Sequence, residues 1–269
     1  MRKIICIIYS IIFFIFPCIN SCKISKETIY SLNDLYIAMA EDCIEHKASA
    51  QYFISFKCPD LECCVVENIL EKRQNTMGLC LKSIDWHGYQ TLSGYVFNIE
   101  YSYHTTAKEM EISKKIAQEI ANDIQGLSTY EKVKVVHDYL AISCKYDGNG
   151  TSPYSALLKK KTNCAGYALA FKMIMDASNV QSAYQTSDTH AWNTVRIDNE
   201  WYNIDVCWDD AGAHEGDAPL IMYDYFLKGQ EDWQNHPDNK ATATKGYEGD
   251  LMFGAEIVEK LLKKDFTNN

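Results

Sequence analysis

The sequence has few of the residues that mark linkers, metal knuckles or nucleic-acid contacts. Its 269 residues include only 5 prolines and 13 glycines, and no stretch is repetitive or low in complexity, so no long linker is indicated. The 11 cysteines form no C-x-x-C pair and the 7 histidines no H-x-x-x-H pair, which argues against a metal site. The net charge is −10 and no basic run is interleaved with aromatic residues, which argues against a nucleic-acid partner. No cofactor is indicated.

One long apolar run is present, at the start of the chain. Arg2 and Lys3 precede an apolar stretch over residues 4–19, the pattern of an export signal. This stretch is shorter than the roughly 20 residues that a membrane-spanning helix needs. The Ile-Asn-Ser sequence before Cys22 resembles a bacterial lipobox, whose cysteine is lipidated and becomes the mature N-terminus. The sequence predicts export, as a secreted protein or a cell-envelope lipoprotein attached through Cys22. An uncleaved anchor is the remaining alternative.

Charge and cysteine use fit an exported, acidic protein. Without Arg2 and Lys3 the chain keeps 24 basic residues against 36 acidic ones, a net charge of −12. Once Cys22, Cys164 and the two cysteines of the signal are set aside, seven cysteines are left, an odd number that cannot all pair with one another. In an oxidising compartment some members of one sequence cluster could form disulfides. That cluster comprises Cys58, Cys63, Cys64 and Cys80.

Composition and residue periodicity divide the chain into a signal over 1–22, an α+β extension over 23–105 and a third region over 106–269. The expected elements of the extension are helices near 33–47 and 59–74, with strands at 49–56, 78–84 and 94–104. The last strand alternates, so its aromatic and apolar residues share one half-buried face: Tyr95, Phe97, Ile99, Tyr101 and Tyr103.

Two capping boxes open the helices of the third region. They are Thr106-Ala-Lys-Glu109, before an amphipathic helix that Gly126 ends, and Ser128-Thr-Tyr-Glu131. His137 falls on or beside the apolar face of the second helix, where a core or boundary role is expected.

A single cysteine at a helix start carries the first chemical signal. A turn cluster at 147–150 and a short helix near 155–160 precede "TNCAGYALAFKMIMDA", where Thr162 or Asn163 can cap a helix that begins at Cys164. Backbone N–H groups and the positive end of the helix dipole converge on that sulfur and stabilise a thiolate. Cys164 is therefore a candidate nucleophile.

The stretches "HAWNTVRI" and "EWYNIDVCW" are typical of a β-hairpin whose two-residue type I′ turn is Asp198-Asn199. That register places His190 opposite Cys207 and one diagonal step from Asp205 on the same face, within reach of long side chains. A three-residue loop would put His190 and Asp205 on opposite faces.

Cys164, His190 and Asp205 supply the groups of a thiol acyl-transfer site. The thiolate attacks, the imidazole acts as base and then acid, and the carboxylate orients the ring. The backbone N–H of Cys164 is a natural oxyanion donor. The Tyr146 hydroxyl is a further candidate donor, although a packing role is favoured for it. Taken singly, an inert cysteine at a helix start or a histidine on a strand is the more ordinary interpretation.

The same residues carry a family resemblance. "TNCAGYALAF", "THAWNTVRIDNEWYNIDVCWDD" and "YDYFL" resemble the core of the transglutaminase-like superfamily in its bacterial form, over about residues 128–227. The resemblance implies an α+β, papain-like fold in which the cysteine-bearing helix packs on an antiparallel sheet. Residues 23–105 resemble the small N-terminal extension of some members. The resemblance of the core also implies that Cys164 is the nucleophile, His190 the base and Asp205 the orienting acid.

One residue departs from the family pattern, and one acidic loop raises the question of calcium binding. The pattern more often has threonine where this chain has Cys207, for which a packing substitute is favoured over a second thiol beside the site. Animal transglutaminases use calcium, but the acidic loop at 209–217 lacks the ordered ligand spacing of a calcium loop, so a solvated loop is favoured.

The residues support two functional hypotheses. The first is an enzyme that transfers the acyl group of an amide through a thioester, acting on extracellular or cell-envelope protein. If water accepts the acyl group, the enzyme is a peptidase or deamidase, and if an amine accepts it, the enzyme is a cross-linking transglutaminase. The resemblance favours hydrolysis, but the residues themselves do not decide between the two acceptors. The second is a non-catalytic surface module that keeps the fold to bind a peptide or cell-wall partner. The intact Cys, His and Asp argue against this second hypothesis.

Overall fold

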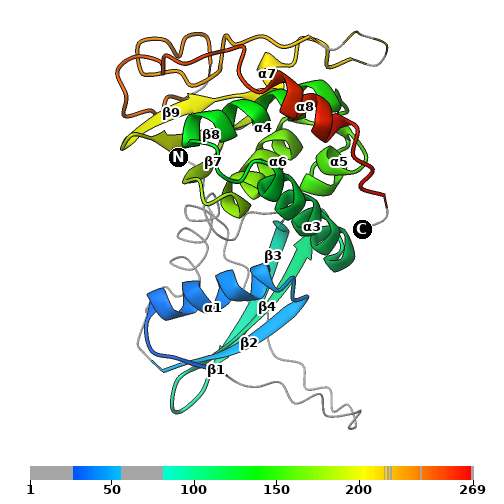
Figure 1. Ribbon diagram of the computed structural model, residues 1–269. Coiled ribbons are helices and arrows are strands. Elements are labelled where there is room, and N and C mark those ends of the chain that lie inside the picture. Colours follow the sequence, from blue (N-terminus) through cyan, green and yellow to red (C-terminus); the bar gives the residue numbers. More distant parts are fainter. Residues whose placement is uncertain are drawn as a thin grey trace.

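The computed structural model describes residues 27–55, 81–214, 216, 218, 220–236 and 238–267. Three predicted features lie outside the described residues: the export signal with Cys22, the helix at 59–74, and the sequence cluster Cys58, Cys63, Cys64 and Cys80. No helix within the described ranges is long and apolar enough to cross a membrane. The described residues gather around two hydrophobic cores, one in each of the two bodies that Figure 1 shows.

The smaller, N-terminal body is a four-stranded sheet with one helix across a face (Figure 1). Its elements are β1 (Glu27–Ile29), α1 (Leu32–Ile44), β2 (Ser49–Ile54), β3 (Leu81–Gln90) and β4 (Tyr95–Tyr103). The strand order is β1-β2-β4-β3, with β1 parallel to β2 and the other pairs antiparallel.

Alternation along β4 builds the core of this body. Phe97, Ile99 and Tyr101 are buried in one cluster with Leu35 and Met39 of α1, which confirms the predicted apolar face. Strand β3 runs to Gln90, beyond its predicted end at residue 84, because it pairs with β4 almost along its whole length.

Two capped helices, α3 (Ala107–Asp123) and α4 (Thr129–Ser143), begin the larger body. Both predicted capping boxes are confirmed, since the Thr106 and Ser128 hydroxyls accept hydrogen bonds from the backbone N–H groups three residues later, and the Glu109 and Glu131 carboxylates accept in return from the two cap N–H groups. Gly126, which follows α3, has a φ of 91°, a left-handed conformation that favours glycine.

The rest of the larger body surrounds one buried helix. Its elements are β5 (Lys145–Tyr146), α5 (Pro153–Leu157), β6 (Lys161–Thr162), α6 (Cys164–Ala177), β7 (Ser182–Thr186), β8 (Ala191–Ile197), β9 (Glu200–Ile204), α7 (Val206–Asp209) and α8 (Ala255–Leu262). Strands β7, β8 and β9 form an antiparallel sheet, and α6 packs on β7 and β8 and against α3, α4 and α5. A cysteine-bearing helix on an antiparallel sheet is the predicted α+β architecture.

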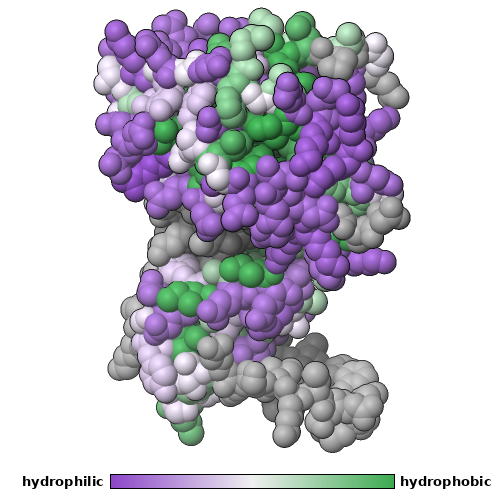
Figure 2. Space-filling model, viewed as in Figure 1, coloured by the Kyte–Doolittle hydropathy of each residue, from purple (hydrophilic) through white to green (hydrophobic). Residues whose placement is uncertain are grey.

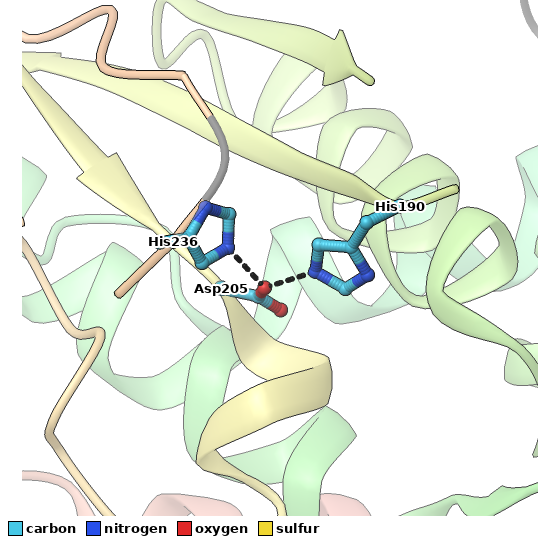
Figure 3. Close-up of side chains that lie close together, drawn as sticks. All are labelled: His190, Asp205 and His236. Carbon is cyan, nitrogen blue, oxygen red and sulfur yellow. Dashed lines mark hydrogen bonds and ion pairs between the residues drawn. The ribbon is translucent and has the colours of Figure 1, made fainter. Parts of the chain in front are cut away.

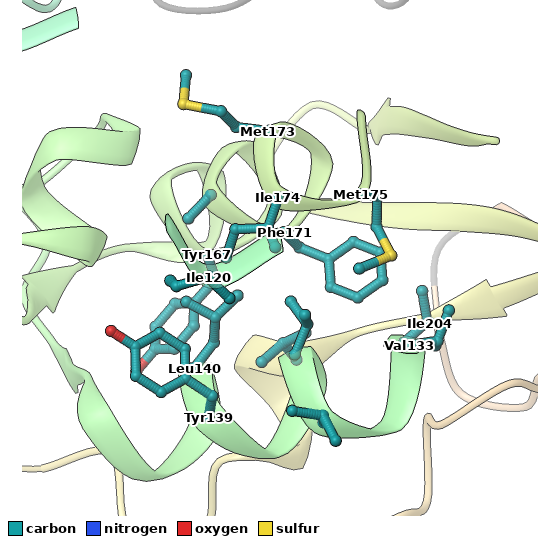
Figure 4. Packing of buried hydrophobic residues seen from close by; sticks show 14 of the residues in the cluster. Ile120, Val133, Tyr139, Leu140, Tyr167, Phe171, Met173, Ile174, Met175 and Ile204 are labelled. Carbon is teal, nitrogen blue, oxygen red and sulfur yellow. The ribbon is translucent and has the colours of Figure 1, made fainter. Parts of the chain in front are cut away.

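Most of helix α6 is buried. Ala168, Phe171 and Met175 are all buried. Figure 4 shows Phe171 and Met175 near Val133 of α4 and Ile204 of β9. Each fully buried large apolar side chain contributes about 1.5–3 kcal/mol relative to its exposed state. The helix that presents Cys164 is thereby held rigidly between the sheet and α4.

The outer surface gives less information about function. The face in Figure 2 is mainly hydrophilic over the larger body, with hydrophobic side chains in patches among the hydrophilic ones. Scattered apolar exposure of this kind is ordinary for a protein surface.

Candidate active site

The helix cap places the Cys164 sulfur. Asn163, one of the two predicted caps, fills that position, and its Oδ1 accepts a hydrogen bond of 3.2 Å from the Gly166 N–H. Thr162 instead is buried and donates from Oγ1 to the Gly150 carbonyl at 2.9 Å. A Cβ on Gly166 would lie 1.7 Å from that Oγ1, so this close approach requires glycine. Cys164 thus begins α6 as predicted, and its side chain is half-buried.

The predicted hairpin and its register are confirmed. Asp198 and Asn199 form the two-residue turn with φ values of 51° and 70°, both positive as a type I′ turn requires. Ile197 pairs with Glu200, and the ladder continues in the predicted register until residue 193 meets residue 204. The loop length therefore sets the face on which the next residues lie.

The predicted strand through Trp208 is wrong beyond Ile204. Asp205 caps the short helix α7, because its Oδ1 accepts a hydrogen bond of 3.1 Å from the Trp208 N–H and draws the chain into a helical turn. Cys207 therefore lies in a helix and not opposite His190 in the sheet. The Cys207 side chain is buried, and burial raises the pKa of its thiol far above the ordinary value, which fits the favoured packing role.

His190 and Asp205 nevertheless form the expected pair. The His190 Nε2 lies 2.5 Å from the Asp205 Oδ2 (Figure 3). His190 precedes β8 in a loop closed by a hydrogen bond of 2.9 Å from the Ser187 N–H to the His190 carbonyl. The side chains of His190 and Asp205 are 10% and 1% exposed, so the contact is shielded from water.

The sulfur completes the arrangement. The His190 ring and the backbone N–H groups of Ala165 and Ala191 lie close enough to the Cys164 sulfur to lower the pKa of its thiol. Asp205 occupies Nε2 of His190, so Nδ1 is the ring nitrogen that remains for the sulfur. The structure thus brings together all three residues that the sequence singled out. Their catalytic roles stay a prediction.

Local charges favour a thiolate beside an imidazolium. Burial alone would raise the pKa of Cys164, but the His190 ring and the two backbone N–H groups outweigh it and hold this pKa below 9.0. Burial likewise would lower the pKa of His190, but Asp205 and Cys164 raise it to about 9. The pKa of Asp205 would rise on burial and is instead held below 3.8, chiefly by its hydrogen bonds with His190 and His236. The lowered pKa of the thiol and the raised pKa of the ring both favour the proton on His190.

Comparison with known proteins places this segment in a family. Residues 114–206 match the family model of the Transglutaminase-like superfamily. The chain carries a transglutaminase-like domain. A search of curated proteins found no match. Among solved structures, "a Putative Cysteine Protease from Cytophaga hutchinsonii" is similar at 12% identity and a TM-score of 0.32. That match covers 52% of this chain and 66% of the other, less than two thirds of its length.

A second histidine, His236, was not found by reasoning from the sequence. Its Nε2 lies 2.8 Å from the same Asp205 Oδ2 that His190 contacts (Figure 3). His236 comes from the irregular chain between α7 and α8, 31 residues after Asp205. No periodicity, cap or turn motif relates two such positions, so the sequence carries no signal for this contact.

Three side chains of the site, His190, Asp205 and His236, carry metal-binding atoms that lie within 4.8 Å of one another. Tetrahedral zinc holds its ligands at about 2.0–2.1 Å, so its ligand atoms are about 3.3 Å apart. The two nitrogen–oxygen separations, 2.5 Å and 2.8 Å, are shorter than this and match hydrogen bonds. The geometry therefore describes two donors on one carboxylate oxygen.

Helix α7, which holds Asp205, is fixed by its last residue and by the residue that follows. Asp209 lies 3.1 Å from the Nε2 of His137 in α4, and it accepts a hydrogen bond of 2.9 Å from the Tyr225 N–H. Asp210 accepts one of 2.7 Å from the hydroxyl of Tyr167 in α6. His137 is fully buried, which confirms its predicted core role. Asp205 thus stands on a turn tied to two core helices.

Two aromatic side chains border the pair on the exposed side. The Trp208 ring lies 4.9 Å from the His190 ring and is 39% exposed. Tyr146 is 44% exposed, and burial together with the nearby charges of Cys164 and Cys207 raises the pKa of its hydroxyl. These rings provide apolar surface next to the sulfur; the donor role considered for Tyr146 stays a prediction.

Proposed function

We propose that this protein is a thiol-dependent acyltransferase or hydrolase acting on amide bonds, with Cys164 as nucleophile, His190 as acid and base, and Asp205 as orienting acid. One observation carries the proposal: a sulfur at a helix N-terminus contacts a histidine whose far nitrogen lies 2.5 Å from a buried carboxylate. The match to the Transglutaminase-like superfamily supports a thiol-dependent activity in general.

The first half-reaction forms a thioester. The Cys164 thiolate attacks the amide carbon, and the new S–C bond turns the carbonyl oxygen into an oxyanion. The Cys164 N–H, free at the start of α6, is placed to donate to that oxyanion. The His190 imidazolium then gives its proton to the departing amine as the C–N bond breaks. Asp205 stabilises the positive ring throughout.

The second half-reaction releases the acyl group. Water or a primary amine donates a proton to His190 and attacks the thioester carbon, which frees the thiolate. Hydrolysis would make the protein a peptidase or deamidase, and aminolysis would make it a cross-linking transglutaminase. The exposed rings of Trp208 and Tyr146 support a polypeptide substrate, since they offer apolar contacts to residues beside the amide. Export, with or without a lipid on Cys22, would give access to envelope or extracellular protein.

Alkylation of the sulfur tests the proposal without a known substrate. The wild type, Cys164→Ser and His190→Ala are treated with iodoacetamide between pH 5 and 9, and the modified cysteine is identified by intact-mass and peptide analysis. We expect Cys164 to react well below pH 8 in the wild type, and the His190→Ala profile to shift to that of an ordinary thiol near pH 8.5. Cys207 is an internal control, because a buried thiol of raised pKa should stay unmodified.

The acceptor is then determined by products. With casein as a general protein substrate, new N-termini and conversion of glutamine to glutamate report hydrolysis, and incorporation of a fluorescent primary amine reports transfer. All three should be absent in Cys164→Ser. A Cys164 that reacts no faster than free cysteine would reject the enzymatic proposal and leave the binding-module hypothesis.

A further inference from the structure

His236 donates the second hydrogen bond to the site's carboxylate. Its Nε2 lies 2.8 Å from Asp205 Oδ2, and its side chain is 0% exposed (Figure 3). A buried polar ring carries a desolvation cost that an apolar side chain of similar size would avoid. The hydrogen bond to a charged acceptor offsets that cost only while the ring stays in this geometry.

The surroundings hold the His236 ring in place. It lies 3.9 Å from the Trp233 ring, 4.5 Å from that of Trp208 and 4.9 Å from that of Trp192. The Trp233 Nε1–H donates to the Asp238 carbonyl at 2.7 Å, which closes the chain around residue 236. Three indole rings from separate segments thus preorganise the imidazole against the carboxylate.

Titratable groups among the described residues face this ring. They include the Asp205 carboxylate, the His190 imidazole before β8, and the phenol of Tyr225, whose ring lies 5.5 Å away. A neutral imidazole with its proton on Nε2 already donates the bond to Asp205. The contact therefore needs no second positive charge beside His190.

We infer that His236 is a positioning residue for the Cys164–His190 pair, because it fixes the Asp205 carboxylate as a second donor on the oxygen that His190 uses. This inference rests on the proposed function. A second donor holds the carboxylate in one orientation. It also withdraws electron density from the shared oxygen and so weakens the hold of Asp205 on the His190 proton. His190 then stays directed at the sulfur and remains acidic enough to protonate a leaving amine.

Two variants separate this role from a structural one. His236→Gln keeps an N–H donor that can reach Asp205, and His236→Leu keeps a similar volume without a donor. Histidine ¹⁵N and ¹³C NMR over pH 5–11 follows the His190 titration and the tautomer of His236. Iodoacetamide alkylation and thermal unfolding are measured alongside.

We expect the wild-type spectrum to show His236 protonated at Nε2. In His236→Leu the His190 titration should move upward from about 9 by roughly half a pH unit or more, because Asp205 then holds the His190 proton more tightly. His236→Gln should restore the wild-type titration.

Two results would overturn the inference. One is a His236 protonated at Nδ1 only, which could not donate to Asp205. The other is a His190 titration that does not change in folded His236→Leu. Failure of the proposed function is a distinct result, in which wild-type Cys164 reacts like an ordinary thiol whatever the His190 titration shows.

Discussion

Helix α7 carries an aspartate at each end, and each aspartate is paired with a histidine, yet the two pairs have different surroundings. At the start, Asp205 faces His190, whose side chain is 10% exposed and borders the Cys164 sulfur. At the end, Asp209 faces His137, and both side chains are 0% exposed. Two aspartates four positions apart, each paired with a histidine, therefore lie in different surroundings: one beside a reactive group and the other in a closed core.

The ring nitrogens show what separates the pairs. Both nitrogens of His137 are occupied by carboxylates, Nδ1 by Asp138 at 2.9 Å and Nε2 by Asp209 at 3.1 Å. Lys134, also buried, forms an ion pair with Asp138. His190 has a carboxylate on one nitrogen only. A histidine–aspartate pair can transfer a proton to a substrate only where one nitrogen stays available for a third group, and His137 has none.

The pKa values of the Asp205 and Asp209 carboxyl groups are shifted in opposite directions. Hydrogen bonds from His190, His236 and the Trp208 N–H hold the pKa of Asp205 below 3.8 despite burial. Burial dominates at Asp209 and raises its pKa, although His137 acts in the other direction. Asp205 is thus a firm anion that can stabilise an imidazolium. Asp209 belongs instead to a buried network that holds α7 on α4.

The largest expected effect comes from changing the acid at the start of α7. Asp205→Asn keeps the size of the side chain and the helix cap but removes the charge that stabilises the His190 imidazolium. We expect turnover to fall by about 10³–10⁴-fold, the size of effect for a neutralised orienting acid, and Cys164 alkylation at pH 7 to fall to the rate of an ordinary thiol. Stopped-flow alkylation measures the loss, and circular dichroism should show an intact fold.

Asp209→Asn is the matched change at the other end of the helix. It leaves His137 without one of its anions in a dry core, so we expect the free energy of unfolding to fall by about 3–5 kcal/mol, as for a broken buried ion pair. Urea denaturation measures this loss. Cys164 alkylation of the folded variant should stay within about threefold of the wild type. If Asp209→Asn instead slowed Cys164 alkylation strongly and left the free energy of unfolding unchanged, the Asp209–His137 pair would serve the reactivity of Cys164 and not the stability of the fold.

Local sequence signals predicted most of the fold that positions the site. Both capping boxes, the start of α6 and the two-residue turn depend on residues within a few positions, so propensity and spacing suffice to find them. That turn also fixed the face shared by His190 and Asp205. The match holds because a hairpin register follows from loop length alone.

The sequence did not predict the structure where one residue is compatible with two kinds of element, or where the contacting residues lie far apart in the chain. The alternation of β9 continues past Ile204, so Asp205 fits a strand as well as a helix cap, and only the tertiary fold selects the cap. His236 reaches Asp205 from an irregular segment, and the Asp209 partner of His137 lies 72 residues away. Neither contact has a local signature.

The smallest expected effect is the pH dependence of the free energy of unfolding. It can be measured on the wild type, in which both histidine–aspartate pairs are intact. Folding raises the pKa of His190 from 6.5 to about 9, so the protonated ring contributes stability that is fully present below pH 6.5 and is lost as the pH rises through about 9. This contribution should not exceed ~3 kcal/mol. Burial opposes the shift at His137, yet its two carboxylates raise that pKa too, so the wild type combines two contributions of one sign.

His190→Gln isolates the first of these contributions. The difference in unfolding free energy between wild type and variant, measured by urea titration at each half unit from pH 6 to 10, should shrink as the pH rises toward 9 and then level off. The dependence that remains in the variant belongs to His137 and the other groups of the core. A wild-type-minus-variant difference that is flat across this range would mean that His190 gains no proton on folding, and the ion pair with Cys164 that sets the two ends of α7 apart would not exist.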